Sequence, residues 1–198
     1  MDPVDARATV LLVRHAESEW NASGRWQGHA DPPLSSRGEE QARALGERMQ
    51  GERATLLICS DLRRAVQTAA PVAAALGVEP DLDPLLRELD VGSWSGLRRP
   101  EIEAIDPETL VRFEAGEPTV RPGGGETRAE IRERAHRAMA RRIAANPDGR
   151  IVVVTHLGFI RALLPGEEPD NAGTIEVTAH DLLTRRAQSR STRPHPRL

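Results

Sequence analysis

The sequence contains no lysine, no tyrosine and only one cysteine, Cys59. All 27 basic residues are therefore arginine, which excludes Schiff-base chemistry on a lysine and any P-loop that depends on one. A single cysteine cannot form an internal disulfide, and its place in the apolar run TLLICS predicts a buried structural thiol. No apolar run approaches the roughly 20 residues of a membrane span. These absences leave a globular chain in which arginine is the dominant cation.

The charge balance gives no general reason to expect a nucleic acid or a membrane as a partner. The formal net charge is −3 over 198 residues, which is close to neutral for a chain of this length. The first residues include acids and a proline where a signal peptide would have a basic region and then a long apolar one. We therefore expect a cytoplasmic protein of one domain.

Five segments predict β-strands. Three are apolar runs rich in β-branched residues, at 8–13, 55–60 and 150–155, and such runs are typical of strands buried on both faces. Residues 77–83 contain a proline, which suits a short edge strand, and residues 173–180 predict a last strand.

Two helices are predicted between the first strands. Ser36 and Glu39 fit a capping box at the start of one helix, and Gly51 is a plausible end for it. Asp61 is expected to cap the other helix, inside which Pro71 should cause a kink or a break.

Further helices are predicted before and after the third apolar run. Residues 100–115 indicate two short helices that are broken at Pro107. Residues 125–149 indicate one long amphipathic helix, and residues 156–164 a short one.

Strands thus alternate with helices along the chain. This alternation predicts an α/β three-layer sandwich, with a mostly parallel central sheet and helices on both faces. We assign residues 1–183 to this single domain. Residues 184–198 are basic, polar and nonperiodic, so we expect them to form a disordered tail.

Charged side chains and histidines follow the predicted strands. In open α/β sheets, functional groups collect at the carboxyl ends of the strands. The residues that fall there are Arg14, His15, Arg64, Glu88 and His156. We expect these two arginines, two histidines and one glutamate to converge on one site.

Such a set suits the transfer of a phosphoryl group. Arginine forks bind phosphoryl oxygens in pairs and stay cationic at any working pH. A neutral imidazole nitrogen can attack phosphorus, and nearby arginines should lower the pKa of that histidine and keep it neutral. A glutamate can protonate the leaving alkoxide and later activate water. Because the arginines supply the charge stabilisation, we expect no metal ion and no cofactor.

Five motifs that fit this chemistry occur in order between residue 8 and about residue 179. They are RHAESEWNASGRWQG, SDLRRAVQTA, LRELDVGSWSG, PGGGET and VVVTHLGFIRAL. The set resembles the histidine phosphatase superfamily, in its phosphoglycerate mutase-like branch. The resemblance implies a phosphoglycerate mutase-like fold and a histidine acid-type phosphatase that acts on a small phosphorylated metabolite.

The resemblance also implies a role for individual residues. His15 would be the nucleophile that becomes phosphorylated, and Glu88 would be the proton donor. Arg14, Arg64 and His156 would hold the phosphoryl group. The residues implied on the substrate side are Asn21, Ser18, Gln27, Gly28 and Leu157.

The sequence departs from the family pattern at several points. Ala16 and Leu157 stand where glycine is usual after each histidine, and the methyl group of Ala16 is expected to crowd the phosphate loop slightly. Asp61 replaces a common proline. The segment after Arg161 is shorter than in most family members. The resemblance therefore does not determine how the chain makes its last crossover or which strand forms the final edge of the sheet.

Some residues outside these motifs receive a structural interpretation. His136 is expected on a solvated helix face among charged residues. The glycine run 123–125 is not followed by the residues of a P-loop, so a flexible loop is the better interpretation. Glu126 and Thr127 are expected to cap the long helix.

Three functions fit the motifs. A phosphatase is favoured, because the interval between Glu88 and His156 is short and the mutase-type sequence with a tyrosine after the glutamate is absent. A cofactor-dependent phosphoglycerate mutase and a noncatalytic phosphate-binding module are the alternatives. The sequence names neither the phosphomonoester nor the quaternary state, and a homodimer is one state that it allows.

Overall fold

The computed structural model describes residues 6–188, without the side chains of residues 185–188. Its strands are β1 (Thr9–Arg14), β2 (Leu56–Cys59), β3 (Pro80–Leu82), β4 (Arg150–Thr155) and β5 (Thr174–Thr178). Its α-helices are α1 (Glu19–Ala22), α2 (Ser36–Arg48), α3 (Arg63–Leu76), α4 (Arg99–Ile105), α5 (Pro107–Glu114), α6 (Arg128–Ala145), α7 (Leu157–Leu163) and α8 (Ala179–Gln188). Short 3-10 helices are η2 (Pro84–Leu86), η3 (Gly92–Trp94) and η4 (Pro122–Gly124).

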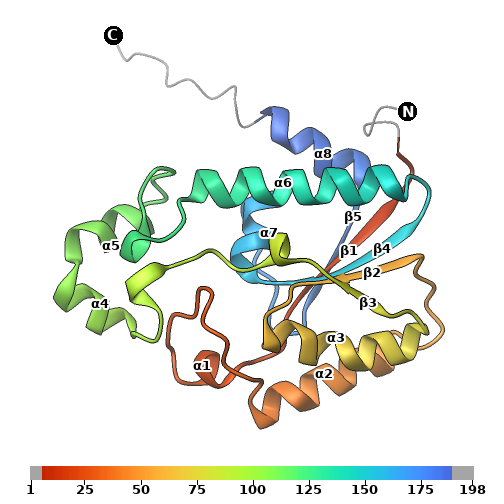
Figure 1. Cartoon of the computed structure of the whole chain (residues 1–198), viewed down its shortest axis with the longest axis horizontal. Coiled ribbons are helices and arrows are strands. Elements are labelled where there is room, and N and C mark those ends of the chain that lie inside the picture. Colours follow the sequence, from red (N-terminus) through yellow and green to blue (C-terminus); the bar gives the residue numbers. More distant parts are fainter. Residues whose placement is uncertain (1–5, 189–198) are drawn as a thin grey trace.

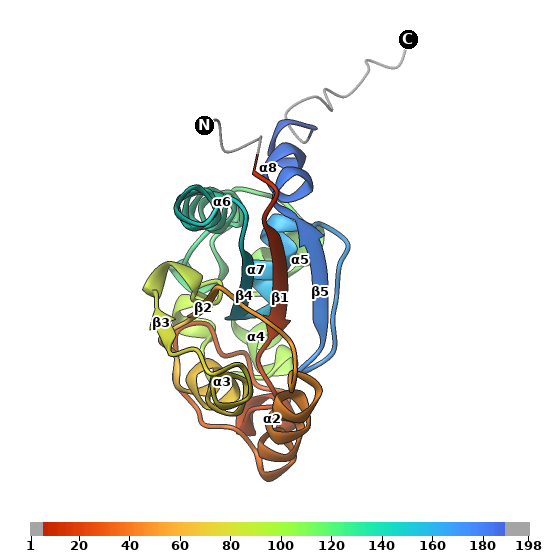
Figure 2. The ribbon, with the colours of Figure 1, turned by 90° about the vertical axis from the view of Figure 1, so that its right-hand side faces the viewer.

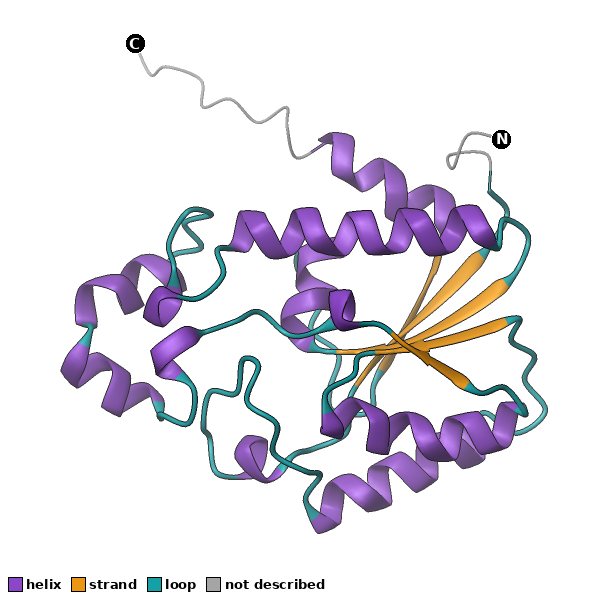
Figure 3. Ribbon diagram, in the orientation of Figure 1, coloured by secondary structure: helices purple, strands orange, loops and turns teal. Residues whose placement is uncertain are grey.

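The strands form one five-stranded sheet in the order β3-β2-β4-β1-β5 (Figure 1; Figure 3). The pairs β3–β2, β2–β4 and β4–β1 are parallel, and the pair β1–β5 is antiparallel. The predicted mostly parallel sheet is therefore confirmed. The proline-containing strand β3 lies at the edge, where a missing N–H donor does not interrupt a ladder between two neighbours.

Helices cover both faces of the sheet, as Figure 2 shows. The side chains of β1 alternate between two apolar clusters, because successive residues of a strand point to opposite faces. Val10 and Leu12 join the cluster that includes residues of α6 and α7. Leu11 and Val13 join the cluster that includes residues of α2 and α3. The three-layer sandwich is confirmed.

Helix α3 continues through Pro71, so the predicted break does not occur. One face of the helix is buried, including Ala65, Ala69 and Val72, and this burial outweighs the loss of one helical hydrogen bond. Helix α2 approaches α3 closely at Gly46. A Cβ atom at Gly46 would lie 2.8 Å from the carbonyl oxygen of Pro71, so only glycine allows this packing.

Two of the predicted helix starts need correction. Ser35, and not Ser36, caps α2, and its side chain accepts a hydrogen bond from the N–H of Gly38. Asp61 does not cap α3, which begins after Leu62 without a side-chain cap. Asp61 is instead held by Arg87 through two hydrogen bonds of 2.7 and 2.5 Å, since this bidentate ion pair is stronger than a cap.

The last helix extends the ordered chain beyond the predicted boundary. The segment from Thr184 was expected to belong to a disordered tail, but α8 includes residues 184–188. Leu182 of this helix is fully buried and packs in the cluster that contains α6, which explains why the segment folds as a helix. Residues 189–198 lie outside the described residues.

His136 is buried within α6, which corrects the expected solvated position. It lies beside Ala135 and Met139, both of which belong to the core. The pattern of charged residues around His136 in the sequence hid its position on the buried face. Within residues 6–188, none of the helices has the length and apolar character needed to cross a membrane.

Candidate active site

Two histidines meet at the carboxyl ends of the two central strands. His15 directly follows β1 and His156 directly follows β4, which are neighbours in the sheet. The N–H of His15 donates to the carbonyl oxygen of Thr155 at 2.8 Å, so the register of the sheet fixes the two residues relative to each other. The centroids of the two imidazole rings lie 5.0 Å apart. The expected convergence of the two histidines is present.

A cavity of about 330 Å³ opens beside His15, and we call it the catalytic cavity. It is lined by Arg14, His15, Asn21, Arg25, Trp26, Gln27, Gly28, Glu88, Leu89, Val91, Phe113, Arg128, Leu157, Gly158 and Arg161. Most of the residues predicted for the site therefore line it. Arg64, His156 and Ser18 do not line it and lie behind its wall.

His15 is held as a neutral imidazole. Its Nδ1 lies 2.7 Å from the carbonyl oxygen of Ala16. A carbonyl only accepts hydrogen bonds, so Nδ1 carries the proton and Nε2 keeps its lone pair. Burial and the nearby cations Arg64 and Arg14 lower the pKa of His15 to about 3. The ring is consequently in its nucleophilic form at neutral pH.

The methyl group of Ala16 lies in the apolar core between the sheet and helices α2 and α3. Ala16 is fully buried and does not line the catalytic cavity, so the expected crowding of the phosphate loop does not occur. The N–H of Ala16 donates to the hydroxyl oxygen of Thr68 at 3.0 Å, and that hydroxyl donates to the carbonyl oxygen of Arg64. Thr68 thus links the residue after His15 to helix α3.

Arg64 is fully buried behind the catalytic cavity. Its Nη1 and Nη2 donate to the carbonyl oxygens of Ala30 and Gly28, at 2.8 and 3.0 Å. The Nε of Arg64 is buried and meets no acceptor within residues 6–188. Burial lowers the pKa of Arg64 to about 10, so the group remains a cation at neutral pH. In this arrangement Arg64 supports the loop around Gly28 and contributes its positive charge to the field at His15.

His156 is fully buried and is anchored by Ser60, the first residue of the motif SDLRRAVQTA, to which the motif comparison gave no role. The Nε2 of His156 lies 2.8 Å from the hydroxyl oxygen of Ser60. Burial and the charge of Arg64 lower the pKa of His156, so this imidazole is also neutral. Ser60 follows β2 directly, and its place at a strand end is the signal that could have found it.

Glu88 projects into the catalytic cavity on a loop between η2 and η3. Its carboxylate accepts hydrogen bonds from the N–H groups of Leu89 at 2.8 Å and Gly158 at 3.2 Å. A Cβ atom at position 158 would lie 2.1 Å from Oε1 of Glu88. Glycine at the start of α7 is therefore what lets the carboxylate approach the helix.

Arg134 of helix α6 holds the loop that carries Glu88. Its guanidinium donates to the carbonyl oxygens of Leu85, Arg87 and Glu88, at 2.7, 2.9 and 3.2 Å. It also forms an ion pair of 2.6 Å with Glu126, which was expected to cap α6. Only the other predicted cap residue is confirmed, because Thr127 is the N-cap of α6.

The glycine run 123–125 is a packed turn, which corrects the predicted flexible loop. A Cβ atom at Gly123 would lie 2.4 Å from the carbonyl oxygen of Val91, and one at Gly125 would lie 2.3 Å from that of Asp90. Gly123 also has a positive φ of 56°, which disfavours any side chain. The turn packs against the segment that follows Glu88 and so fixes that segment.

The predicted substrate-side residues divide into two groups. Gln27, Gly28, Leu157 and Asn21 line the catalytic cavity. Ser18 is fully buried and caps α1, and its hydroxyl donates to Oε1 of Gln27 at 2.7 Å. Ser18 also holds the side chain of Asn21, because its N–H donates to Oδ1 of Asn21 at 3.1 Å, so it acts on the site through these two residues.

Asn171 is a further residue beside the nucleophile that the sequence did not reveal. Its Nδ2 donates to the carbonyl oxygen of His15 at 3.1 Å. It lies in the shortened segment before β5, which the motifs do not cover. The short segment thus still closes the sheet edge beside His15.

Three arginines that the motif comparison did not assign also line the catalytic cavity. They are Arg25, Arg128 and Arg161. With Arg14 they outnumber the one carboxylate in the wall, Glu88. A cavity with a neutral imidazole, one carboxylate and several guanidinium groups can bind an anion such as a phosphoryl group and can move a proton.

Proteins of similar sequence and fold include phosphatases and a phosphoglycerate mutase-like protein. A family model for the histidine phosphatase superfamily (branch 1) matches residues 10–183. Phosphoglycerate mutase-like protein 4 of Arabidopsis thaliana is 38% identical over 165 residues, which are 82% of this chain and 72% of that protein. Phosphoserine phosphatase 1 of Hydrogenobacter thermophilus is 35% identical over 154 residues, which are 78% of this chain and 73% of that protein. The solved structure of a mycobacterial glucosyl-3-phosphoglycerate phosphatase with VO3 has a TM-score of 0.79 and 30% identity, and the match covers 86% of this chain and 90% of that chain.

Proposed function

The chain belongs to the histidine phosphatase superfamily, branch 1, and from this premise we propose that it hydrolyses a small phosphomonoester through a phosphohistidine on His15. The activity class is that of the phosphoglycerate mutase-like phosphohydrolases, among which relatives named as phosphatases occur. The observation that carries the proposal is the state of His15, a buried neutral imidazole whose free Nε2 belongs to a cavity rich in arginine.

In the first step of the proposed reaction, Nε2 of His15 attacks phosphorus. The bond between phosphorus and the ester oxygen breaks, and the carboxylic acid form of Glu88 gives its proton to that oxygen. In the second step, the Glu88 carboxylate takes a proton from water as the water oxygen attacks phosphorus. The bond between phosphorus and Nε2 breaks, inorganic phosphate leaves and His15 and Glu88 return to their starting forms.

Positive charge stabilises the transferring group in this proposal. Arg14 lines the catalytic cavity and can contact phosphoryl oxygens directly. Arg64 and His156 lie behind the wall. Arg64 supports the group through its charge and by holding the carbonyl oxygen of Gly28, whereas the neutral His156 contributes only through its contact with Ser60. Because guanidinium groups supply the stabilisation, the reaction needs no metal ion and no cofactor.

A phosphoglycerate mutase is the second candidate, because a relative at 38% identity is named as phosphoglycerate mutase-like. A mutase must return the phosphoryl group from the histidine to its bound product, whereas a phosphatase lets water take it. Interconversion of 2- and 3-phosphoglycerate without release of phosphate would favour the mutase over our proposal.

The test is phosphate release from a panel of phosphomonoesters, with and without a metal chelator. We expect release that the chelator does not affect and that His15→Ala reduces by at least about a thousandfold, since the covalent route is lost. His180→Ala is the matched control, because His180 is exposed on α8 and lies outside the catalytic cavity. Full activity of His15→Ala, or strict dependence on an added metal, would contradict the mechanism.

The proposal also includes the partners and the location expected from the sequence. The partner is a small phosphorylated metabolite, and the location is the cytoplasm. Size-exclusion chromatography distinguishes a monomer from the homodimer that the sequence allows, and cell fractionation tests the location.

A further inference from the structure

The catalytic cavity contains more arginine than the proposed reaction uses. Arg14 is assigned to the transferring phosphoryl group, whereas Arg25, Arg128 and Arg161 also line the cavity and have no assigned role. Arg25 is satisfied within the protein, because it donates to the carbonyl oxygen of Gly96 at 2.5 Å and lies 3.8 Å from Glu101. Arg128 and Arg161 are the two arginines of the cavity that remain without a role.

Arg128 is held rigidly but lacks a counter-ion. Its guanidinium lies over the ring of Phe113, 4.3 Å from the ring centroid, and its Nη2 donates to the carbonyl oxygen of Phe113 at 3.2 Å. Within residues 6–188, no carboxylate forms an ion pair with Arg128, and its buried Nε meets no acceptor. A fixed cation without a counter-ion is ready to bind an anion.

Arg161 carries a second cation into the same cavity. One of its nitrogen atoms, Nη2, forms an ion pair of 2.6 Å with the exposed Glu168, and its buried Nε meets no acceptor in the described part of the chain. Burial is the main reason why the pKa values of Arg128 and Arg14 are lowered, and the charge of Arg161 lowers both further. The three cations thus repel one another, and an anion between them would relieve the repulsion.

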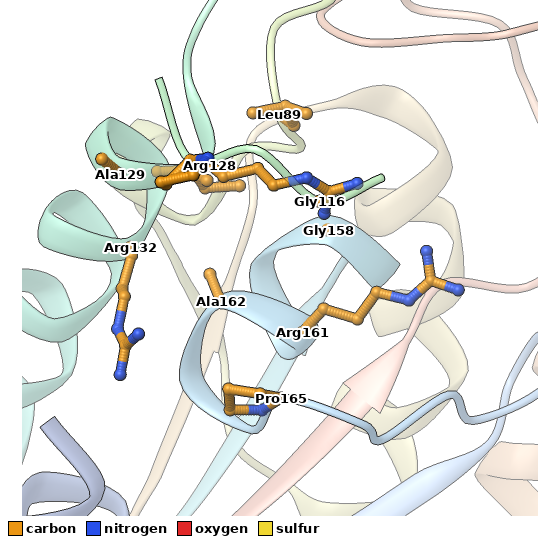
Figure 4. Close-up of a pocket in the computed structure, with 11 residues that line it drawn as sticks. Leu89, Gly116, Arg128, Ala129, Arg132, Gly158, Arg161, Ala162 and Pro165 are labelled. Carbon is orange, nitrogen blue, oxygen red and sulfur yellow. The ribbon is translucent and has the colours of Figure 1, made fainter. Parts of the chain in front are cut away.

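A second cavity of about 390 Å³ adjoins the catalytic cavity, and Figure 4 shows its wall. Both cavities share Leu89, Arg128, Gly158 and Arg161. In this view the guanidinium groups of Arg128 and Arg161 extend to the same side, away from Arg132. The lining residues of this second cavity include no aspartate or glutamate among residues 6–188. The two arginines therefore stand at the boundary between the cavities, where the nearby carboxylates are Glu88 of the catalytic cavity and the exposed Glu168 that pairs with Arg161.

We infer that Arg128 and Arg161 form a second anion site, so that the substrate is a phosphomonoester whose leaving group carries another anionic group. The inference rests on the proposed function, because it assumes that Arg14 and His15 receive the phosphoryl group. A carboxylate and a second phosphate share the required chemistry, since both accept paired hydrogen bonds from guanidinium groups. The size of the catalytic cavity suits a small substrate.

Matched pairs of substrates test the inference. O-phospho-L-serine and O-phosphoethanolamine differ only in a carboxylate, and 1,3-propanediol bisphosphate and 3-hydroxypropyl phosphate differ only in a second phosphate. For at least one pair, we expect the dianionic leaving group or the carboxylate to raise kcat/KM by about 10- to 100-fold, the range of a charge-assisted hydrogen bond. The pair that shows the effect identifies the kind of anion.

Two variants and one control locate the effect. Arg128→Gln and Arg161→Gln should each move the kcat/KM ratio of that pair toward one. Arg132→Gln is the control, because Arg132 also lies on α6 but its guanidinium points away from the other two arginines. We expect the control to keep the ratio of the unchanged protein.

Calorimetry on the His15→Ala variant separates the inference from the proposed function. Phosphoserine should bind more tightly than phosphoethanolamine, or the bisphosphate more tightly than its partner, and Arg128→Gln should remove the difference. If this difference is present but no ester is hydrolysed by the unchanged protein, the proposed function fails and the anion site stands. Ratios near one for both pairs, or ratios that both arginine variants preserve, would overturn the inference.

Discussion

At the scale of single residues, the environment of His15 determines both reactivity and acid stability. The carbonyl oxygen of Ala16 fixes the tautomer, and burial with the charges of Arg64 and Arg14 keeps the ring neutral. The same burial keeps His156 neutral. Two neutral histidines in the fold mean that the unfolded chain binds protons at a higher pH than the folded protein does.

This difference predicts that the protein loses stability as the pH falls from about 6.5, the ordinary pKa of histidine. The folded pKa of His15 is about 3, so in this window the unfolded state binds a proton that the folded state does not, and folding is disfavoured. Each such histidine lowers the free energy of unfolding by up to about 1.4 kcal/mol per pH unit. Urea denaturation between pH 7 and pH 5 measures the slope.

The His15→Gln variant tests whether His15 causes the slope of the free energy of unfolding against pH. Because glutamine does not titrate, we expect the dependence on pH to fall by about one proton relative to the unchanged protein. An identical dependence in both proteins would show that folding does not lower the pKa of His15, and it would contradict the environment described for this ring.

At the scale of elements, the start of α7 and the loop after η2 together place the proton donor. The N–H of Gly158 donates to Glu88, and Arg134 of α6 fixes the backbone of the same loop. The turn at 123–125 packs against the segment that follows Glu88. Three separate elements therefore determine where one carboxylate lies.

Gly158→Ala tests this placement. The added Cβ would lie 2.1 Å from Oε1 of Glu88, so the carboxylate must move, while alanine favours the helix by about 1 kcal/mol over glycine. We expect kcat for alkyl phosphates to fall by about tenfold or more, with the thermal midpoint kept or raised. The measurement is steady-state kinetics beside thermal unfolding.

A good leaving group supplies the internal control for Gly158→Ala. p-Nitrophenyl phosphate needs little help from a proton donor, so its hydrolysis should fall much less than that of an alkyl phosphate. An equal loss on both substrates would indicate a general distortion of the cavity and would contradict a specific effect on Glu88.

At the scale of the whole molecule, the sequence predicts the architecture well, because the spacing of apolar residues and the composition of each segment indicate strands and helices. The apolar runs predict the three central strands, and the strand ends carry His15 and His156 to one edge of the sheet. Helix α8 escaped prediction because its short, charged sequence folds only where Leu182 finds the core. His136 was misplaced for a similar reason, since burial depends on which face of α6 meets the rest of the molecule.

The depth of the site residues is the part that sequence patterns do not encode. The motif identifies Arg64 as a site residue. It does not reveal that the guanidinium of Arg64 donates to the carbonyl oxygens of Gly28 and Ala30. Arg128 and Arg161 reach the catalytic cavity from α6 and α7, and their meeting depends on how these helices pack. Such convergence of distant segments is visible only in the folded chain.

Trapping of the phosphorylated protein tests the central claim most directly. The unchanged protein is mixed with a labelled phosphomonoester, denatured within milliseconds and digested, and the labelled peptide is sequenced by mass spectrometry. We predict an acid-labile, alkali-stable phosphoryl group on His15 that forms before phosphate is released and is absent from His15→Ala. Phosphate release without any phosphorylated protein, or a label on a residue other than His15, would contradict the account.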